Sequence, residues 1–259
     1  MPRSPSRQPS DLRLNQAIAH AGVCSRRAAD VMIKAGRVLV NDAPAEHPGA
    51  RFRPGQDRLC IDGCEVTVAP PSTAADRIHL AFHKPVEVVS TMHDPQGRKT
   101  VADFLSESLR AARVLPIGRL DYMSEGLLLL TNDYALINTM THPSHPVPKV
   151  YEVRFEGPFE DSMLQEMRRG MTLSDGERLR PVQARLVRRS NRGGVMHCTL
   201  HQGVNRQLRR MCRDLGLSVK RLIRIRHGPV SLADLPSGQL KRLRDQVFKH
   251  VSDGGRSGR

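Results

Sequence analysis

Residues 118–133 decide the fold of this chain and read Gly-Arg-Leu-Asp-Tyr-Met-Ser-Glu-Gly-Leu-Leu-Leu-Leu-Thr-Asn-Asp. The apolar run Leu127–Leu130 is bounded by Gly126 and Thr131, which predicts a short strand buried on both faces. The loop before this strand then holds the Asp121 carboxylate at the edge of the core, where a charge is costly unless it is paired and hydrogen-bonded. The spacing alone leaves two roles open for Asp121, a structural turn or cap and a chemical group.

The composition indicates a protein that binds a polyanion. The 259-residue chain has a formal net charge of +15 and a pI near 10.6, and an excess of Lys and Arg on this scale attracts nucleic acid. A membrane surface is the competing polyanion. However, no apolar stretch approaches the roughly 18 residues of a membrane span, and the first residues carry no signal-peptide pattern. We therefore expect a cytoplasmic protein that does not bind membranes.

The sequence predicts no metal site and no organic cofactor. The five cysteines are scattered, and the closest pair, Cys60 and Cys64, lacks the second pair or nearby histidine that would complete a tetrahedral zinc site. We expect all five to be reduced thiols. His142 and His145 lie three residues apart in a proline-rich segment, but no further ligand accompanies them.

The first part of the chain predicts a small domain of helices and strands. Residues 1–10 are rich in Pro, Ser and Arg and predict a disordered basic lead-in. Apolar residues at helical spacing predict one helix that ends at Gly22 and a second that Ser25 caps and Gly36 ends. Short strands are expected near residues 37–42 and 57–63. Residues 69–76 begin Ala-Pro-Pro-Ser-Thr and predict a linker.

The rest of the chain predicts a larger domain, residues 77–246, before a disordered basic tail at 247–259. Its helices are expected at 102–112, after Asp133 and at 160–169, and its strands at 78–83, 149–155, 178–188 and 195–200, with a hairpin turn at 190–194. A last helix, ended by Gly216, places its apolar residues on one face: Leu208, Met211, Cys212 and Leu215. Its opposite face is basic and carries Arg206, Arg209, Arg210 and Arg213. These arginines repel one another unless a phosphate or a carboxylate neutralises them.

Several motifs, in one order along the chain, resemble the RsuA, RluB, RluE and RluF family of ribosomal RNA pseudouridine synthases. Residues 118–133 are similar to the central motif of that family, and further matches are Lys-Pro at 84–85, His-Pro-Ser-His at 142–145 with Lys-Val-Tyr at 149–151, and Asn-Arg-Gln-Leu-Arg-Arg-Met at 205–211. Residues 24–41 resemble an S4 RNA-binding domain. The segment 203–212 leans toward RluF, whereas Thr-His-Pro-Ser-His at 141–145 leans toward RsuA and RluB.

The resemblance implies the fold and the division of the chain. The expected class is α+β, with an S4 domain at 11–68 that contains two helices and short strands. It is joined to a catalytic domain at 77–246 with a mostly antiparallel mixed sheet flanked by helices. Three positions depart from the family pattern: Asp42 and Glu87 stand where glycine is common, and Val204 stands where many relatives have Arg or Lys.

The resemblance also implies the site. Asp121 is expected to be the catalytic nucleophile, Arg119 to help displace the target base, Tyr151 to pack on that base, and Arg209 to pair with Asp121 and favour its ionised form. The residues expected to contact RNA are basic or amide side chains from both domains: Arg26, Arg27, Lys34, Arg37, Lys84, Asn205, Arg206, Arg210 and Arg213.

The expected function is isomerisation of a specific uridine to pseudouridine in ribosomal RNA. We expect 23S rather than 16S rRNA as substrate, with tRNA as another possible class, and a monomeric enzyme that flips the target base out of the stack. The reaction exchanges a C1′–N1 bond for a C1′–C5 bond and needs no outside group. Whether Asp121 attacks the sugar or first removes a proton stays open. The alternative is a non-catalytic RNA-binding ribosome-assembly factor; a hydrolase would need a second acid near Asp121.

Overall fold

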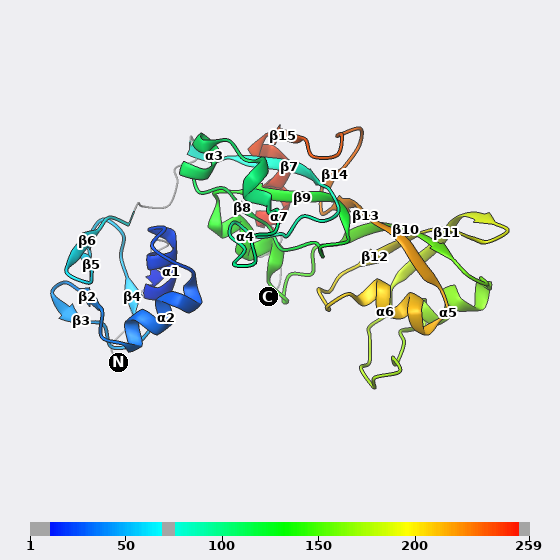
Figure 1. Cartoon of the computed structure of the whole chain (residues 1–259), viewed down its shortest axis with the longest axis horizontal. Helices are drawn as coiled ribbons and strands as arrows, with labels where there is room; N and C mark the ends of the chain where they lie inside the picture. Colours follow the sequence, from blue (N-terminus) through cyan, green and yellow to red (C-terminus); the bar gives the residue numbers. More distant parts are fainter. Residues whose placement is uncertain (1–10, 69–75, 254–259) are drawn as a thin grey trace. The chain divides into compact units, whose positions relative to one another are not determined.

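The computed structural model describes residues 11–68 and 76–253 of the chain (Figure 1). The chain forms two compact units that divide between Asp76 and Arg77. The predicted lead-in at 1–10, most of the predicted linker and the last six residues of the predicted tail lie outside the described residues. Within the described part of the chain, no helix is both long enough and apolar enough to cross a membrane.

The N-terminal unit packs two helices against short strands. Its elements are α1 (Leu14–His20), α2 (Arg26–Lys34), β1 (Leu12–Arg13), β2 (Val38–Val40), β3 (Ala43–Pro44), β4 (Arg51–Phe52), β5 (Leu59–Ile61) and β6 (Cys64–Val66). The strands pair in the orders β3-β2-β5-β6 and β1-β4. As predicted, Ser25 caps α2, since its hydroxyl accepts a hydrogen bond from the Ala28 amide at 3.2 Å. Leu14, Ile18 and Ile33 lie in one buried cluster.

The C-terminal unit is built on one mixed sheet with the strand order β11-β12-β10-β13-β9-β7-β15. Its strands are β7 (His79–Lys84), β8 (Leu115–Pro116), β9 (Glu125–Thr131), β10 (Lys149–Glu156), β11 (Gln183–Ser190), β12 (Gly193–Leu200), β13 (Ser218–His227), β14 (Val230–Ser231) and β15 (Leu240–Leu243). Neighbours in this order run antiparallel except β13 and β9, which are parallel. The predicted α+β class with a mostly antiparallel mixed sheet is confirmed.

Strand β9 is buried on both faces, as the sequence predicts, and all of its residues are buried. Its side chains alternate between two hydrophobic clusters. Leu128 and Leu130 join the larger one, whereas Leu127 and Leu129 join a second cluster on the other face. Full burial of a leucine side chain contributes about 1.5–3 kcal/mol, so this strand anchors both faces of the sheet and gives the loop before it a rigid support.

Helices cover both faces of this sheet (Figure 1). They are η2 (Val101–Phe104) and η3 (Asp245–Phe248), which are 3-10 helices, and α3 (Glu107–Ala111), α4 (Tyr134–Thr141), α5 (Asp161–Arg169), α6 (Gln207–Asp214) and α7 (Lys249–Asp253). Helices α5 and α6 contribute Leu164 and Met211 to the larger cluster. Helix α4 contributes Met140 to the second one. As predicted, Asp133 caps α4.

Two predictions about helices are wrong. The single helix expected at 102–112 is interrupted, because the Ser106 hydroxyl accepts a hydrogen bond from the Leu109 amide and starts α3 as a separate helix. The tail expected from residue 247 is ordered up to residue 253, where η3 and α7 form. Phe248 is only 4% exposed and packs in the second cluster, so burial of this aromatic ring holds the segment on the domain.

Gly126 lets two strands approach closely beside the Asp121 loop. Its φ is +104°, and a Cβ at this position would lie 2.5 Å from the carbonyl oxygen of Arg224 on β13. Only glycine fits such an approach. The parallel pairing of β9 and β13 therefore brings Arg224 against the strand that follows Asp121.

Candidate active site

A cavity of about 940 Å³ lies in the C-terminal unit. Its wall is formed by the loop 117–124, the loop 140–149, the segment 200–208 that leads into α6, and strands β10 and β13. Of the residues predicted for the site, the wall contains Arg119, Asp121, Tyr151, Asn205 and Arg206. The fold thus brings a carboxylate and a phenol ring, 30 residues apart in the chain, to one pocket.

The backbone of the Asp121 loop is held at every carbonyl group from residue 119 to residue 123. Four of the five donors come from other parts of the chain, and the third belongs to the loop itself. The donors are, in order, Arg224 Nη1 (3.4 Å), Ser90 Oγ (2.8 Å), Ser124 N (3.0 Å), Glu87 N (2.8 Å) and Arg209 Nη2 (2.6 Å). Buried carbonyl groups need such partners, and together these bonds leave the loop little freedom. Asp121 is therefore presented to the cavity by a rigid backbone.

Ser90 fixes the residue directly before Asp121. Its hydroxyl, which is buried, donates to the Leu120 carbonyl at 2.8 Å and accepts from the Leu120 amide at 3.0 Å. Ser90 was not among the residues predicted for the site. Its partner, Leu120, is 30 residues away in the sequence, so no local pattern predicts this contact.

Replacing Ser90 by Ala is expected to lower the free energy of unfolding by about 1–3 kcal/mol, because two buried backbone groups of Leu120 lose their partner. Turnover should also fall by about tenfold, since the acid is then less well held. Chemical denaturation and steady-state kinetics measure the two effects. Ser90→Thr, which retains a hydroxyl, should recover turnover, and Ser108→Ala on the exposed face of α3 should change neither quantity; equal effects of both alanine variants would contradict this role.

Glu87, which departs from the family pattern, has the backbone conformation of a glycine. Its φ is +59°, a left-handed conformation that favours glycine, and its amide donates to the Tyr122 carbonyl. A side chain in this conformation carries a modest strain, and the loop contact compensates for it. The backbone at this position is thus the one that glycine adopts readily, although the residue is Glu.

The Asp121 carboxylate is half-buried and accepts no hydrogen bond and no ion pair within 4 Å from the described residues. The predicted direct pairing with Arg209 is therefore not made in this structure. Arg209 instead donates to the Met123 carbonyl at 2.6 Å. Burial and the neighbouring Arg206 lower the pKa of Arg209, and the negative charge of Asp121 opposes this shift. Arg209 thus acts on Asp121 through the loop and through its electric field.

Lys84 was predicted to contact RNA, and this prediction is wrong. Its side chain is completely buried, and its ammonium group donates to the carbonyl groups of Pro85 at 2.7 Å and Val88 at 2.8 Å. Burial lowers the pKa of Lys84 from 10.5 to about 8, although the Asp121 and Glu125 carboxylates act in the opposite direction. Lys84 is therefore an internal cation near Asp121 rather than a surface contact.

The Lys84 shift predicts how stability depends on pH. Between pH 8 and 10.5 the unfolded chain holds the Lys84 proton more strongly than the folded chain, so raising the pH across this window favours the folded state. The wild-type protein should gain up to about 3 kcal/mol relative to Lys84→Met over this window. Denaturation curves of both proteins at several pH values measure the difference. The pKa of Lys149 is also lowered, but both proteins contain Lys149, so its contribution cancels in the difference. A constant difference would contradict the burial argument.

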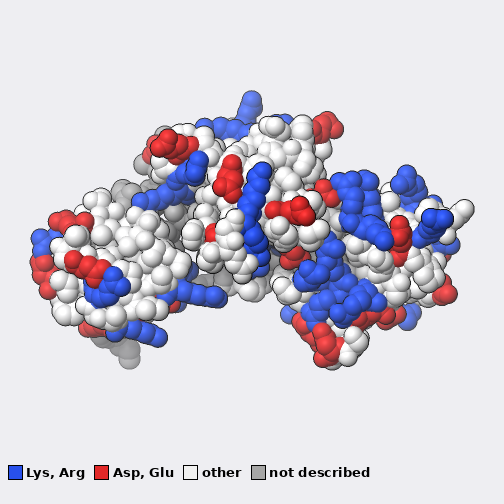
Figure 2. Space-filling view, in the orientation of Figure 1, with Lys and Arg blue, Asp and Glu red and all other residues white. Residues whose placement is uncertain are grey.

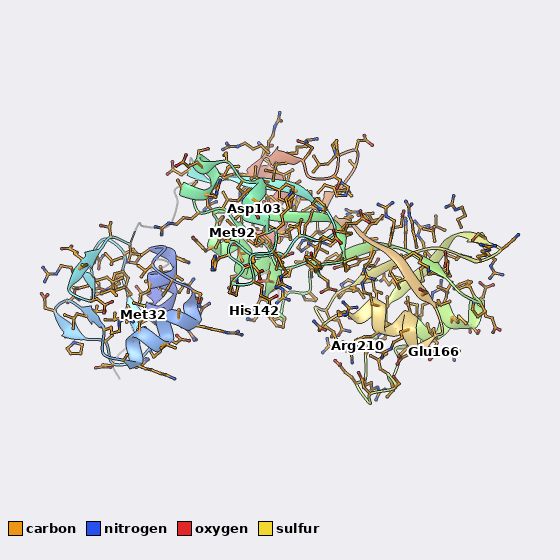
Figure 3. The ribbon with its side chains drawn as sticks, viewed as in Figure 1. Met32, Met92, Asp103, His142, Glu166 and Arg210 are labelled. Atoms are coloured by element: carbon orange, nitrogen blue, oxygen red, sulfur yellow. The ribbon has the colours of Figure 1, made fainter. Side chains whose placement is uncertain are left out.

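The basic face of α6 is only partly available to RNA. Figure 2 shows Lys and Arg gathered over this helix with acidic residues beside them. Arg210, which is labelled in Figure 3, pairs with Asp175 and Glu177, each at 2.6 Å. Arg213 pairs with Asp214 at 3.0 Å. The predicted RNA contact of Arg210 gains no support from this structure, because two carboxylates already neutralise the guanidinium. Arg206 and Asn205 remain exposed at the cavity.

The predicted RNA contacts of the N-terminal unit lie on its surface. Arg26, Arg27 and Lys34 belong to α2 and are exposed. Arg37 is also exposed, but its guanidinium forms two hydrogen bonds with the Asp62 carboxylate. Three of these four cations thus have no ion-pair partner among the described residues.

Sequence reasoning gave no role to the buried residues of the cavity wall. Arg224 is 1% exposed, and its Nε donates to the Leu127 carbonyl at 2.6 Å. A local signal for burial was its place between two isoleucines, Ile223 and Ile225. The Nδ1 atom of His142 lies 2.6 Å from the Ser144 hydroxyl, and the described residues contain no group of three or more His, Cys, Asp or Glu side chains that could hold a metal ion.

Comparison with known proteins identifies the family. Residues 78–214 match the family of RNA pseudouridylate synthases, and residues 12–57 match the S4 domain. The chain is 34% identical to ribosomal large subunit pseudouridine synthase B of Bacillus subtilis (strain 168), over 92% of this chain and 95% of that protein. It is 37% identical to the dual-specificity RNA pseudouridine synthase RluF of Shigella flexneri, over 94% of this chain and 81% of that protein.

A solved structure shares the fold. The crystal structure of a pseudouridylate synthase superposes with a TM-score of 0.66 at 24% identity, and the match covers 93% of this chain and 99% of that one. At this identity the superposition supports the fold, while the sequence relatives carry the family assignment. The cavity with its carboxylate, the S4 unit and these relatives agree, and the chain belongs to the family of RNA pseudouridine synthases.

Proposed function

We propose that this enzyme converts a specific uridine of 23S ribosomal RNA to pseudouridine and that Asp121 carries the chemistry. The observation that supports this most is the Asp121 carboxylate itself. It faces a cavity that also contains the Tyr151 ring, its backbone is held at each neighbouring carbonyl group, and no described side chain occupies its oxygen atoms. The name of the Bacillus subtilis relative, a large-subunit enzyme, supports the choice of 23S rRNA.

The proposed reaction uses side chains alone. The Asp121 carboxylate reacts with the target nucleotide, at the ribose or by removing a proton. The C1′–N1 bond breaks, the uracil turns, and C5 joins C1′; the C5 proton leaves and N1 gains a proton, so atoms balance without a cofactor. Tyr151, 9% exposed in the cavity wall, offers a flat ring on which the flipped uracil packs. Arg119 is exposed at the same cavity and takes the place of the displaced base.

The two units are proposed to have different main roles, RNA binding and catalysis. We propose that residues 11–68 hold RNA through Arg26, Arg27, Lys34 and Arg37, which contact phosphates without reading sequence, and that residues 77–253 carry out catalysis. Asn205, Arg206 and Arg213 are proposed to contact RNA beside the cavity. The enzyme is proposed to act as a monomer in the cytoplasm, where ribosomal RNA is found.

Pseudouridine mapping in ribosomal RNA tests the proposal. Cells that lack this protein should lose a 23S pseudouridine, and the wild-type gene should restore it whereas Asp121→Asn should not. The same maps of 16S rRNA and tRNA identify the substrate if it is not 23S. Unchanged maps in all three RNA classes would instead favour a non-catalytic RNA-binding factor.

A further inference from the structure

Three nitrogen-bearing side chains, Lys149, Arg224 and His227, line one part of the cavity. Lys149 opens β10 and is the register partner of His227 on β13, and Arg224 lies three residues before His227 on the same strand. Arg224 and His227 are 1% and 0% exposed, and Lys149 is half-buried. We call these residues the Lys149 cluster. None of them was among the residues predicted for the site.

The polar atoms of the Lys149 cluster are poorly satisfied. Nη2 of Arg224 and both ring nitrogens of His227 are buried without a hydrogen-bond partner. Lys149 donates one hydrogen bond, to the Val147 carbonyl at 3.2 Å. Buried polar atoms normally have partners, and each one left unpaired costs about 1–3 kcal/mol. Their concentration at one cavity points to a partner that binds there.

The positive charge of the Lys149 cluster indicates that the partner is an anion. No carboxylate among the described residues lies within 4 Å of these three side chains. Burial, with repulsion from Arg224, lowers the pKa of Lys149 to about 8. Burial lowers the pKa of His227 well below its ordinary value, and repulsion from the positive charges of Arg224 and Lys149 lowers it further. Buried cations that lack a counter-ion are strongly destabilising unless an anion compensates them.

We propose that Lys149, Arg224 and His227 form an anion-binding subsite that holds a phosphate group of the RNA strand carrying the target uridine. This rests on the proposed function, because phosphate is the charged group of RNA. The planar guanidinium and the ammonium suit phosphate oxygens, and neutral His227 donates one N–H. Arg224 also donates to the Arg119 carbonyl. The same side chain therefore contacts both the bound phosphate and the loop that presents Asp121.

The first test uses inorganic phosphate as the probe. Thermal unfolding of the full chain is measured with phosphate or chloride at equal ionic strength, because a ligand bound to the folded state raises the melting temperature. Phosphate should stabilise the wild-type protein more than chloride does. Lys149→Met should lose most of this difference, and Lys149→Arg should keep it. Lys241→Met, which removes an exposed charge on β15 at the edge of the sheet, is the matched control and should keep it too.

The second test distinguishes RNA from a free anion. Binding of unmodified 23S rRNA is measured at several salt concentrations for Asp121→Asn and for Asp121→Asn with Lys149→Met. Loss of one phosphate contact should lower the slope of log affinity against log salt by about 0.7–0.9. An unchanged slope with lost phosphate stabilisation would overturn the RNA assignment in favour of a free small anion, and no change in either test would overturn the subsite.

Pseudouridine formation by the wild-type protein is measured on the same RNA and separates the two proposals. Absence of pseudouridine together with a Lys149-dependent phosphate effect would reject the proposed function and keep the anion site. Pseudouridine formation without any Lys149-dependent effect would reject the anion site and keep the proposed function.

Discussion

Replacing Asp121 by Asn is expected to abolish pseudouridine formation, with a loss of about 10⁴-fold or more in turnover, because the amide has the same size but is neither a nucleophile nor a base. RNA affinity should stay within about twofold, since the Asp121 carboxylate repels phosphate rather than binding it. The assay is tritium release from 23S rRNA labelled at C5 of uridine, because joining C5 to C1′ expels that hydrogen.

The matched control for Asp121→Asn is Asp234→Asn. Asp234 is an exposed carboxylate of the same unit that does not line the cavity. It should retain wild-type turnover within about twofold, as exposed substitutions away from special features have small effects. If Asp121→Asn retained a few per cent of wild-type turnover, another group would have to perform the covalent or proton-transfer step, and the proposed role of Asp121 would be rejected.

Replacing Arg209 by Ala is expected to lower turnover by about 10–150-fold with little change in RNA affinity. Its guanidinium holds the Met123 carbonyl at 2.6 Å, and a charged hydrogen bond of this kind contributes about 1.5–3 kcal/mol. Its positive charge also attracts the negative charge of the Asp121 carboxylate. Arg209→Lys should recover part of the loss, because it restores the charge without the planar geometry of the guanidinium.

Arg210 provides the control for Arg209. It is the next residue on α6, but its guanidinium pairs with Asp175 and Glu177 and not with the Asp121 loop. Arg210→Ala should leave turnover within about threefold, since exposed or partly exposed ion pairs contribute about 0–1 kcal/mol. Equal losses in the two alanine variants, measured with the same tritium-release assay, would show that Arg209 serves only the stability of the helix.

The sequence by itself determined the elements whose cause is local. The run Leu127–Leu130 predicted a strand buried on both faces, and β9 is that strand. The spacing of Leu208, Met211 and Cys212 predicted the buried face of α6, and all three are buried. Ser25 and Asp133 cap the helices that they were predicted to cap. Periodicity and caps depend on residues within a few positions of one another, so one sequence is enough to read them.

The motifs also determined which acid and which ring to examine, and the fold places Asp121 and Tyr151 in one cavity. They did not determine what surrounds Asp121. Lys84 was expected at the surface and is buried, and Arg210 was expected to meet RNA and is held by carboxylates 35 and 33 residues away in the sequence.

Only the tertiary structure decided how the Asp121 loop is held and which cations are buried beside it. Ser90, Arg209 and Arg224 reach the loop from positions between 30 and 105 residues away in the sequence. The physical reason is that hydrogen-bond partners and burial depend on which strands become neighbours. The parallel approach of β13 to β9 at Gly126, which has room for no side chain, is a long-range pairing that no local pattern encodes.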